Sequence, residues 1–234
     1  MRRNHTLTFN DISLIDYQCF YDGSQLWRKP ERLVEKCSVI GRNGDLIIDQ
    51  GSYSNITRPF NCFIRKDFIK NYNNLINKLS ETIGYGRLES SEEPDVFCYA
   101  SLESEIEPNT WQFNEKGTFI LNFNFKPQKW LKSGEIAIPI NSAMTIVNPT
   151  SQVAKPLIEV SGVGTITING IELILATNTS TTIIDCETEN AYEGTINRNG
   201  DLTVNNGFPT LDLGENEISV SGCTINLIPR WWRL

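Results

Sequence analysis

The residue types that perform most acid–base and nucleophilic chemistry are sparse in this chain of 234 residues. His5 is the only histidine, and a Ser-His-Asp or Cys-His arrangement needs a positioned histidine. It lies in a polar stretch near the N-terminus, where we expect it to be exposed. A surface or packing role is therefore the better interpretation of His5.

The cysteines do not follow a metal-binding pattern. No two of them form a CxxC pair, although zinc ligands normally come in pairs at tight spacing. The N-terminus lacks the apolar core of a signal peptide, so we expect the chain to stay in a reducing cytoplasm. We therefore expect buried, reduced thiols, with no metal and no cofactor. The six are Cys19, Cys37, Cys62, Cys98, Cys186 and Cys223.

Acidic residues are the remaining candidates for catalysis. Glu103, Glu105 and Glu107 alternate, which predicts a solvent-facing strand face. Any two acids can meet in a fold, so a hidden hydrolase stays as the third-ranked hypothesis. Gly162-Val163-Gly164 lacks the third glycine and the helix of a dinucleotide-binding loop, and we interpret it as a hairpin turn. The chain is thus predicted not to be an enzyme.

The charge of the chain limits its partners. The net charge is −7, whereas a nucleic-acid binder needs a basic surface. Residues 1–135 hold 17 basic and 18 acidic side chains, for a net of −1, and residues 136–234 hold 4 and 10, for a net of −6. No apolar run approaches the roughly 20 residues that cross a bilayer. We expect neither sequence-specific nucleic acid nor a membrane as a partner.

The distribution of aromatic residues predicts two differently built cores. Of the 23 Phe, Tyr and Trp residues, 19 lie in 1–135 and 4 lie after it. We place a domain boundary near residues 132–134, which gives a first domain over 1–133 and a second over 134–234.

The first domain combines strands with one helix. Asn43-Gly44 between residues 39–42 and 45–48 predicts a hairpin with a type I′ turn. Strands are expected over 96–102 and 117–125. An apolar stripe at helical spacing predicts a helix over 68–83, with Asp67 as its N-cap and Gly84 and Gly86 at its end. The stripe is Phe68, Tyr72, Leu75, Ile76, Leu79 and Ile83.

The second domain is predicted to contain strands only. Short segments rich in β-branched residues alternate with turns such as Ser161-Gly162 and Ser221-Gly222. This spacing predicts a β-sandwich or barrel of about 100 residues. The expected strands are 136–140, 144–147, 157–160, 164–169, 172–176, 181–186, 202–204, 217–220 and 224–228.

The end of the chain suggests an interface. Tryptophan and arginine dominate the residues that contribute most to protein–protein binding. We expect one C-terminal ring to pack inside the second domain and the other to contact the first domain or a neighbouring protein. The candidate interface residues are Trp27, Arg230, Trp231 and Trp232.

Several phrases, in order, resemble the distal tail protein (Dit) family of long-tailed bacteriophages. Trp27-Arg28-Lys29-Pro30 and Ile40-Gly41-Arg42-Asn43-Gly44-Asp45-Leu46 are similar to its N-terminal region. Its C-terminal region is matched by Asn148-Pro149, Pro156-Leu157-Ile158-Glu159-Val160-Ser161-Gly162, Thr165-Ile166-Thr167-Ile168-Asn169-Gly170, Ile184-Asp185-Cys186-Glu187 and Phe208-Pro209-Thr210-Leu211.

The resemblance implies a mainly β fold: an N-terminal β-sandwich with one α-helix and a C-terminal galectin-like β-sandwich. It implies a short form without an inserted carbohydrate-binding module. It further implies a hexameric ring at the tail tip or baseplate of a phage or prophage, assembled in the bacterial cytoplasm and carried in the virion tail. Such a ring joins the tail tube to the tail-associated lysin or receptor-binding proteins and lets DNA pass.

A carbohydrate-binding adhesion module is the alternative, with the second domain recognising a host cell-wall glycan. Sugar sites usually stack the sugar on an aromatic ring. Within residues 136–229 the only aromatic residues are Tyr192 and Phe208, which argues against this alternative.

Overall fold

The computed structural model describes residues 4–23, 27–112, 115–178 and 180–234. The chain divides into two compact units, Met1–Lys129 with Leu234 and Trp130–Arg233. The division falls a few residues before the stretch 132–134, where the sequence predicts the boundary. No helix in the described part of the chain combines the length and the apolar character needed to cross a membrane.

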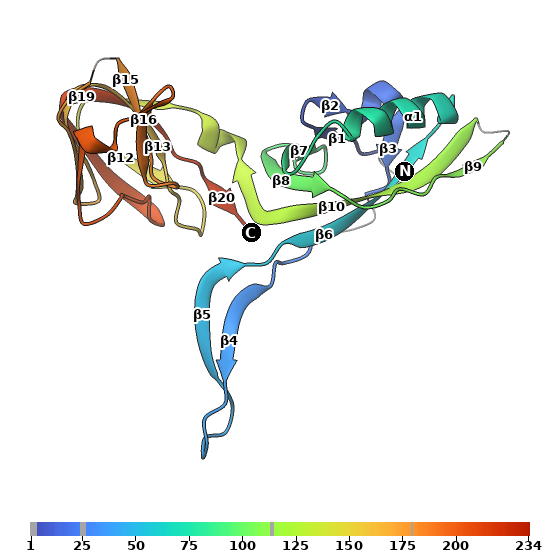
Figure 1. The fold of residues 1–234 in the computed structure, drawn as a ribbon, viewed down its shortest axis with the longest axis horizontal. Helices are drawn as coiled ribbons and strands as arrows, with labels where there is room; N and C mark the ends of the chain where they lie inside the picture. Colours follow the sequence, from blue (N-terminus) through green and yellow to red (C-terminus); the bar gives the residue numbers. More distant parts are fainter. Residues whose placement is uncertain (1–3, 24–26, 113–114, 179) are drawn as a thin grey trace. The chain divides into compact units, whose positions relative to one another are not determined.

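The first unit is built on one β-sheet with the strand order β2-β1-β7-β8-β10-β6-β3 (Figure 1). Its longest pairing is antiparallel, from Gly117↔Ile64 to Phe125↔Ile56, and joins β10 to β6. Short β9 pairs with the start of β10. The strands are β1 (Leu7–Phe9), β2 (Ile12–Ser13), β3 (Cys19–Tyr21), β6 (Ile56–Ile64), β7 (Gly86–Ser90), β8 (Val96–Leu102), β9 (Asn109–Trp111) and β10 (Lys116–Leu131), and a 3-10 helix covers Leu14–Tyr17.

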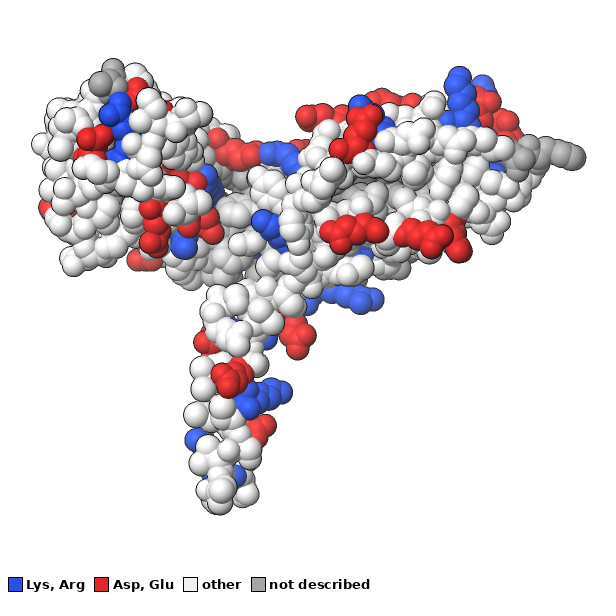
Figure 2. All heavy atoms as spheres, viewed as in Figure 1, with Lys and Arg blue, Asp and Glu red and all other residues white. Residues whose placement is uncertain are grey.

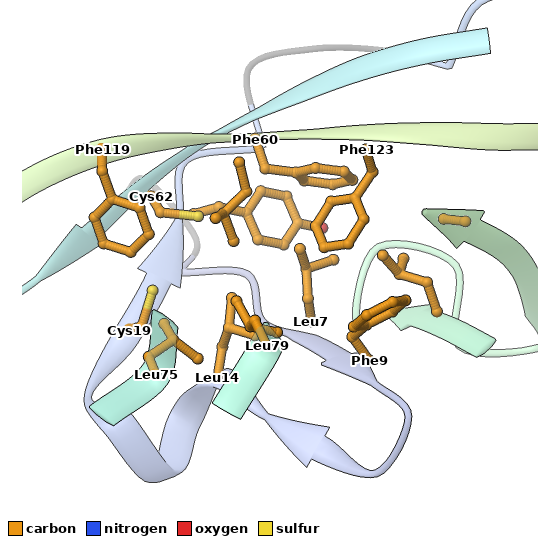
Figure 3. Close-up of a cluster of buried hydrophobic side chains, with 14 of the residues drawn as sticks. Leu7, Phe9, Leu14, Cys19, Phe60, Cys62, Leu75, Leu79, Phe119 and Phe123 are labelled. Carbon is orange, nitrogen blue, oxygen red and sulfur yellow. The ribbon is translucent and has the colours of Figure 1, made fainter. Parts of the chain in front are cut away.

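The core of this unit is aromatic. Inward-facing residues alternate along β6 and β10, a pattern typical of half-buried strands. Phe60 and Phe123 from these strands meet Leu7 and Phe9 from β1 in Figure 3. The Phe9 and Phe123 rings lie 5.2 Å apart, edge to face, which is a favoured aromatic geometry.

Helix α1 (Phe68–Leu79) covers this core with Phe68, Leu75 and Leu79. The helix ends four residues before the predicted end, and Ile83 is 96% exposed, so its inclusion in the apolar stripe was wrong. The predicted capping role of Asp67 was also wrong. Asp67 adopts a left-handed conformation (φ 50°), and its side chain makes no capping hydrogen bond.

The predicted hairpin exists, but its turn differs. Strands β4 (Arg32–Cys37) and β5 (Leu46–Tyr53) pair from Arg32↔Tyr53 to Cys37↔Leu46. Residues 38–45, between the last paired residues, form a long loop. Residues 39–40, which we expected in a strand, lie in this loop, and a turn closes where Arg42 N–H donates to the Val39 carbonyl. The local Asn-Gly preference for a two-residue turn therefore does not decide the geometry.

The second unit is a β-sandwich of short and long strands. The strands are β11 (Ile138–Ile140), β12 (Met144–Asn148), β13 (Leu157–Ile168), β14 (Ile171–Leu175), β15 (Thr181–Asp185), β16 (Asn190–Glu193), β17 (Ile196–Asn197), β18 (Leu202–Asn205), β19 (Gly214–Ile228) and β20 (Trp232–Arg233), with 3-10 helices at Lys132–Glu135 and Asn199–Asp201. Its core is aliphatic apart from Cys186, Cys223 and Trp231 and the partly buried Phe208 and Trp232.

Two long strands correct the sequence prediction for this unit. Ser161-Gly162 and Ser221-Gly222 are not turns, because they lie inside β13 and β19, which pair with each other along their length. The first half of β13 pairs with β15 and its second half with β14, with a register shift between Gly162 and Thr165. A Cβ on Gly164 would lie 2.1 Å from the Ser221 carbonyl oxygen, so the close approach of β13 to β19 at this position needs glycine.

Candidate interface residues

Trp27 packs inside the first unit. Its ring meets Phe125 edge to face, with centroids 4.9 Å apart. Two cations lie over the Trp27 ring: the Arg58 guanidinium carbon at 4.5 Å and the Lys129 Nζ at 4.6 Å from the centroid. Cation–π contacts of this kind are stronger where water is excluded. Trp27 therefore anchors a local charged cluster within its own unit.

This cluster is a feature that the sequence did not reveal. Arg58 is 4% exposed, and its Nη2 donates to the Glu92 carboxylate at 2.7 Å. Lys129 Nζ pairs in the same way with Glu93 at 3.0 Å. The two carboxylates neutralise cations that pack on an aromatic ring, and no sequence signal near 92–93 points to Arg58.

The other three candidates lie together in the second unit. Trp231 is almost fully buried in the aliphatic core, and Trp232 packs against the same core while its Nε1 donates to the Val153 carbonyl at 2.9 Å. Leu131 N–H donates to the Trp231 carbonyl at 2.8 Å, and Arg230 N–H donates to the Gly134 carbonyl at 2.8 Å. These two hydrogen bonds thus join the C-terminal segment to the first residues of the second unit.

An ion pair between Arg230 and Asp185 holds the C-terminal segment in this position. Arg230 Nη1 donates to Asp185 Oδ1 at 2.6 Å, and its Nη2 donates to Oδ2 at 3.4 Å. Burial by itself would raise the pKa of the Asp185 carboxyl. Hydrogen bonds from Arg230 and from the Glu187 backbone N–H outweigh burial, so the pKa lies below its usual value. Arg230 also has a left-handed backbone (φ 56°).

His5 and the buried cysteines, the side chains with the clearest catalytic potential, make structural contacts. His5 forms a backbone bridge with Tyr21, and the two rings lie 5.4 Å apart. Burial raises the pKa of the Cys186 thiol to about 12, which disfavours the reactive thiolate. Five cysteines are buried, and Cys37 is a half-exposed exception on β4. In the described ranges, no three His, Cys, Asp or Glu side chains gather closely enough to hold a metal ion.

The hairpin of β4 and β5 carries several exposed apolar side chains, which the sequence pattern does not predict. Ile40 at its tip is fully exposed, and Ile47 and Ile48 are 62% and 45% exposed. Charged side chains of both signs are spread along it (Figure 2). Its strands pair only with each other in the described part of the sheet topology. An isolated two-stranded ribbon is marginally stable in water, and its unpaired edges invite another chain.

Neither a family model nor a curated protein matches the sequence. Solved structures do match. The Dit protein of phage SPP1, a paradigm of the hub adsorption apparatus in phages that infect Gram-positive bacteria, aligns over 96% of this chain and 98% of its own, with a TM-score of 0.71 and 14% identity. The chain has the fold of a phage distal tail protein.

Two structures of the phage p2 baseplate in its activated conformation, with Ca and with Sr, agree with this assignment of fold. They align over 97% and 99% of this chain, with TM-scores of 0.54 and 0.55 and 10% identity. Because the alignment with SPP1 Dit spans nearly all of both chains, the two have almost the same extent. The two chains therefore share this fold over almost their full length.

Proposed function

We propose that the chain is a structural, non-enzymatic subunit of a phage or prophage tail tip, which acts as the hub of the baseplate. The observation that carries the proposal is the full-length match in fold to SPP1 Dit, which covers both units. The packing roles of His5 and of the buried cysteines are consistent with a structural protein.

We propose further that six copies form a ring. The hairpin supports this step, because its exposed apolar side chains and its two edges, which pair with no other strand among the described residues, form a surface that another chain can cover. A second copy of the same chain supplies such a cover in a closed ring, where each subunit offers the same two surfaces in turn. The hairpin, and with it the aromatic first unit, is then the ring-forming part.

In this role the ring joins the tail tube to the tail-associated lysin or receptor-binding proteins and lets DNA pass through its centre. The second unit, a galectin-like sandwich in this proposal, is carried by the ring. The C-terminal residues Arg230, Trp231 and Trp232 support the fold of that unit, and the half-buried Trp232 ring retains surface for contact with a neighbouring protein.

The test is co-expression with the tail proteins encoded beside the gene. Affinity purification through a tag on this chain is expected to recover the tube protein and the lysin in one complex, with a ring visible by electron microscopy. Ile40→Asp and Ile47→Asp in the same chain are expected to abolish the ring. If the tagged chain is recovered alone after co-expression with each of the neighbouring tail proteins, the hub role is rejected.

A further inference from the structure

The outer face of the first sheet carries a hollow of about 760 Å³ that the proposed hub function does not use. Pockets that bind small ligands typically measure about 300–1,000 Å³ and combine apolar walls with a few polar groups. This hollow has both kinds of lining. Ile120 on β10 is 46% exposed and forms part of its floor, together with Thr118 on the same face of that strand.

One wall presents three different side chains at alternate positions. Glu107, Asn109 and Trp111 all line the hollow, and they offer a carboxylate, an amide and an indole ring in that order. Alternate residues of an extended chain point to the same side, which explains why all three line it. Pairing of Asn109 with Thr118 and of Trp111 with Lys116 fixes this wall against β10. Trp111 is 44% exposed, so its ring is accessible.

The opposite wall comes from β6 and the residue after it. Asn61, Phe63 and Arg65 line the hollow there. The Arg65 guanidinium lies 5.3 Å from the Phe63 ring centroid and donates to Asn4 Oδ1 at 2.7 Å, so its position is set by two contacts. The Asn61 amide donates to Asp22 at 3.4 Å. These contacts hold polar groups at the rim before any ligand arrives.

We propose that this hollow is a saccharide-binding site for a neutral pyranose unit of a glycan. The apolar C–H face of such a sugar stacks on an indole ring, while its hydroxyl groups need both donors and acceptors around the rim. Trp111 supplies the ring, Glu107 supplies acceptors, and Asn109 supplies both a donor and an acceptor. The carboxylates of Asp22 and Glu107 outnumber Arg65 among the lining charges, which disfavours phosphate-bearing polymers.

The site lies in the first unit, whereas the sequence suggests the second unit as the alternative sugar-binding domain. In that unit Phe208 packs against the core, and Tyr192 is half-buried on β16. The sequence could not show the hollow, because Phe63 and Trp111 lie far apart along the chain and meet only through β10. This inference does not depend on the ring.

The test uses the full chain and isothermal titration calorimetry with oligosaccharides of glucose, galactose and N-acetylglucosamine. At least one series is expected to bind saturably. Trp111→Ala is expected to weaken that binding about tenfold or more, because the stacking surface is lost. Glu107→Gln keeps the shape of the side chain and is expected to weaken it less. Tyr85→Ala is the matched control, since Tyr85 is also 44% exposed and lies outside the hollow.

Three results overturn the proposal. The first is the absence of saturable binding to all three series, and the second is binding that Trp111→Ala leaves unchanged. The third is loss of self-association in Trp111→Ala, measured by sedimentation velocity, which would make the hollow a contact between copies of the chain. Sugar binding that fails while the tail complex still assembles rejects this site alone and leaves the hub function standing.

Discussion

Arg230 and Asp185 form a two-point ion pair that joins the end of the chain to the end of strand β15, with the shorter hydrogen bond at 2.6 Å. Trp231 follows Arg230 directly into the core of the second unit. The ion pair therefore positions the backbone from which the most buried tryptophan of that unit extends.

Asp185→Asn is expected to lower the free energy of unfolding of the second unit by about 1–3 kcal/mol at pH 7, since it removes a charge-assisted pair. The pKa of Asp185 is lowered in the folded state, so the pair contributes fully above the unfolded pKa of about 3.9 and its contribution is lost as pH falls through the folded pKa. Urea unfolding at pH 7 and at pH 3 measures this. The difference in free energy of unfolding between wild type and Asp185→Asn should be smaller at pH 3 than at pH 7. Glu187 is an exposed neighbour of Asp185, and Glu187→Gln should unfold with the wild-type free energy at both values of pH. A gap that is equal at both values of pH would contradict the assigned role.

Glu92→Gln tests the charged cluster in the first unit. The variant removes the negative charge that accepts from Arg58 Nη2 at 2.7 Å, and the Arg58 side chain is only 4% exposed. Loss of one partner of a buried pair typically costs about 3–5 kcal/mol. We expect a destabilisation of that order in chemical denaturation, with Glu105→Gln, an exposed acid of the same unit, close to neutral. Equal stability of the two variants would show that Arg58 does not depend on Glu92.

Gly134→Ala tests how tightly the terminal segment packs. A Cβ at this position would lie 2.4 Å from the backbone nitrogen of Trp231, and neither atom can move without shifting the chain. Overpacking of this kind costs about 1–3 kcal/mol. Thermal unfolding should show a lower midpoint for Gly134→Ala. Gly200→Ala is the control, because no heavy atom lies within 4 Å of a Cβ there. If both variants unfold at the wild-type midpoint, the segment is looser than the structure indicates.

Ile47→Asp tests the hairpin as an assembly element. Ile47 is 62% exposed in the single chain, so the substitution should leave the stability of the isolated subunit nearly unchanged. It should nevertheless prevent self-association, because a charge would be buried against the neighbouring copy. Sedimentation velocity measures this. Val147→Asp is a matched control, with the same 62% exposure on strand β12 of the second unit. Normal assembly of Ile47→Asp would exclude the hairpin from the interface.

Local patterns in the sequence predict part of this fold. The alternation of Phe119, Leu121 and Phe123 is read directly as the buried face of β10, and the helical stripe locates α1. The prediction of turns at Ser161-Gly162 and Ser221-Gly222 is wrong, because glycine occurs both in turns and where the backbones of two paired strands approach closely. Only the long-range pairing of β13 with β19 distinguishes them.

The candidate site was less predictable than the fold. Tryptophan and arginine at a chain end suit both an interface and a core, and the structure shows the core packing of Trp231. The sequence predicts the hairpin around Asn43-Gly44 but not the exposure of its apolar side chains, since exposure depends on which surfaces the rest of the chain covers. The same holds for Arg58, whose partner lies 34 positions away in sequence.

Native mass spectrometry of the purified chain tests the central claim most directly, because it counts the subunits. The account predicts a dominant species of six times the 26.5 kDa chain mass, which Ile47→Asp reduces to the single chain. A wild-type protein that remains a single chain at every concentration, alone and with the tail proteins encoded beside it, would contradict the account.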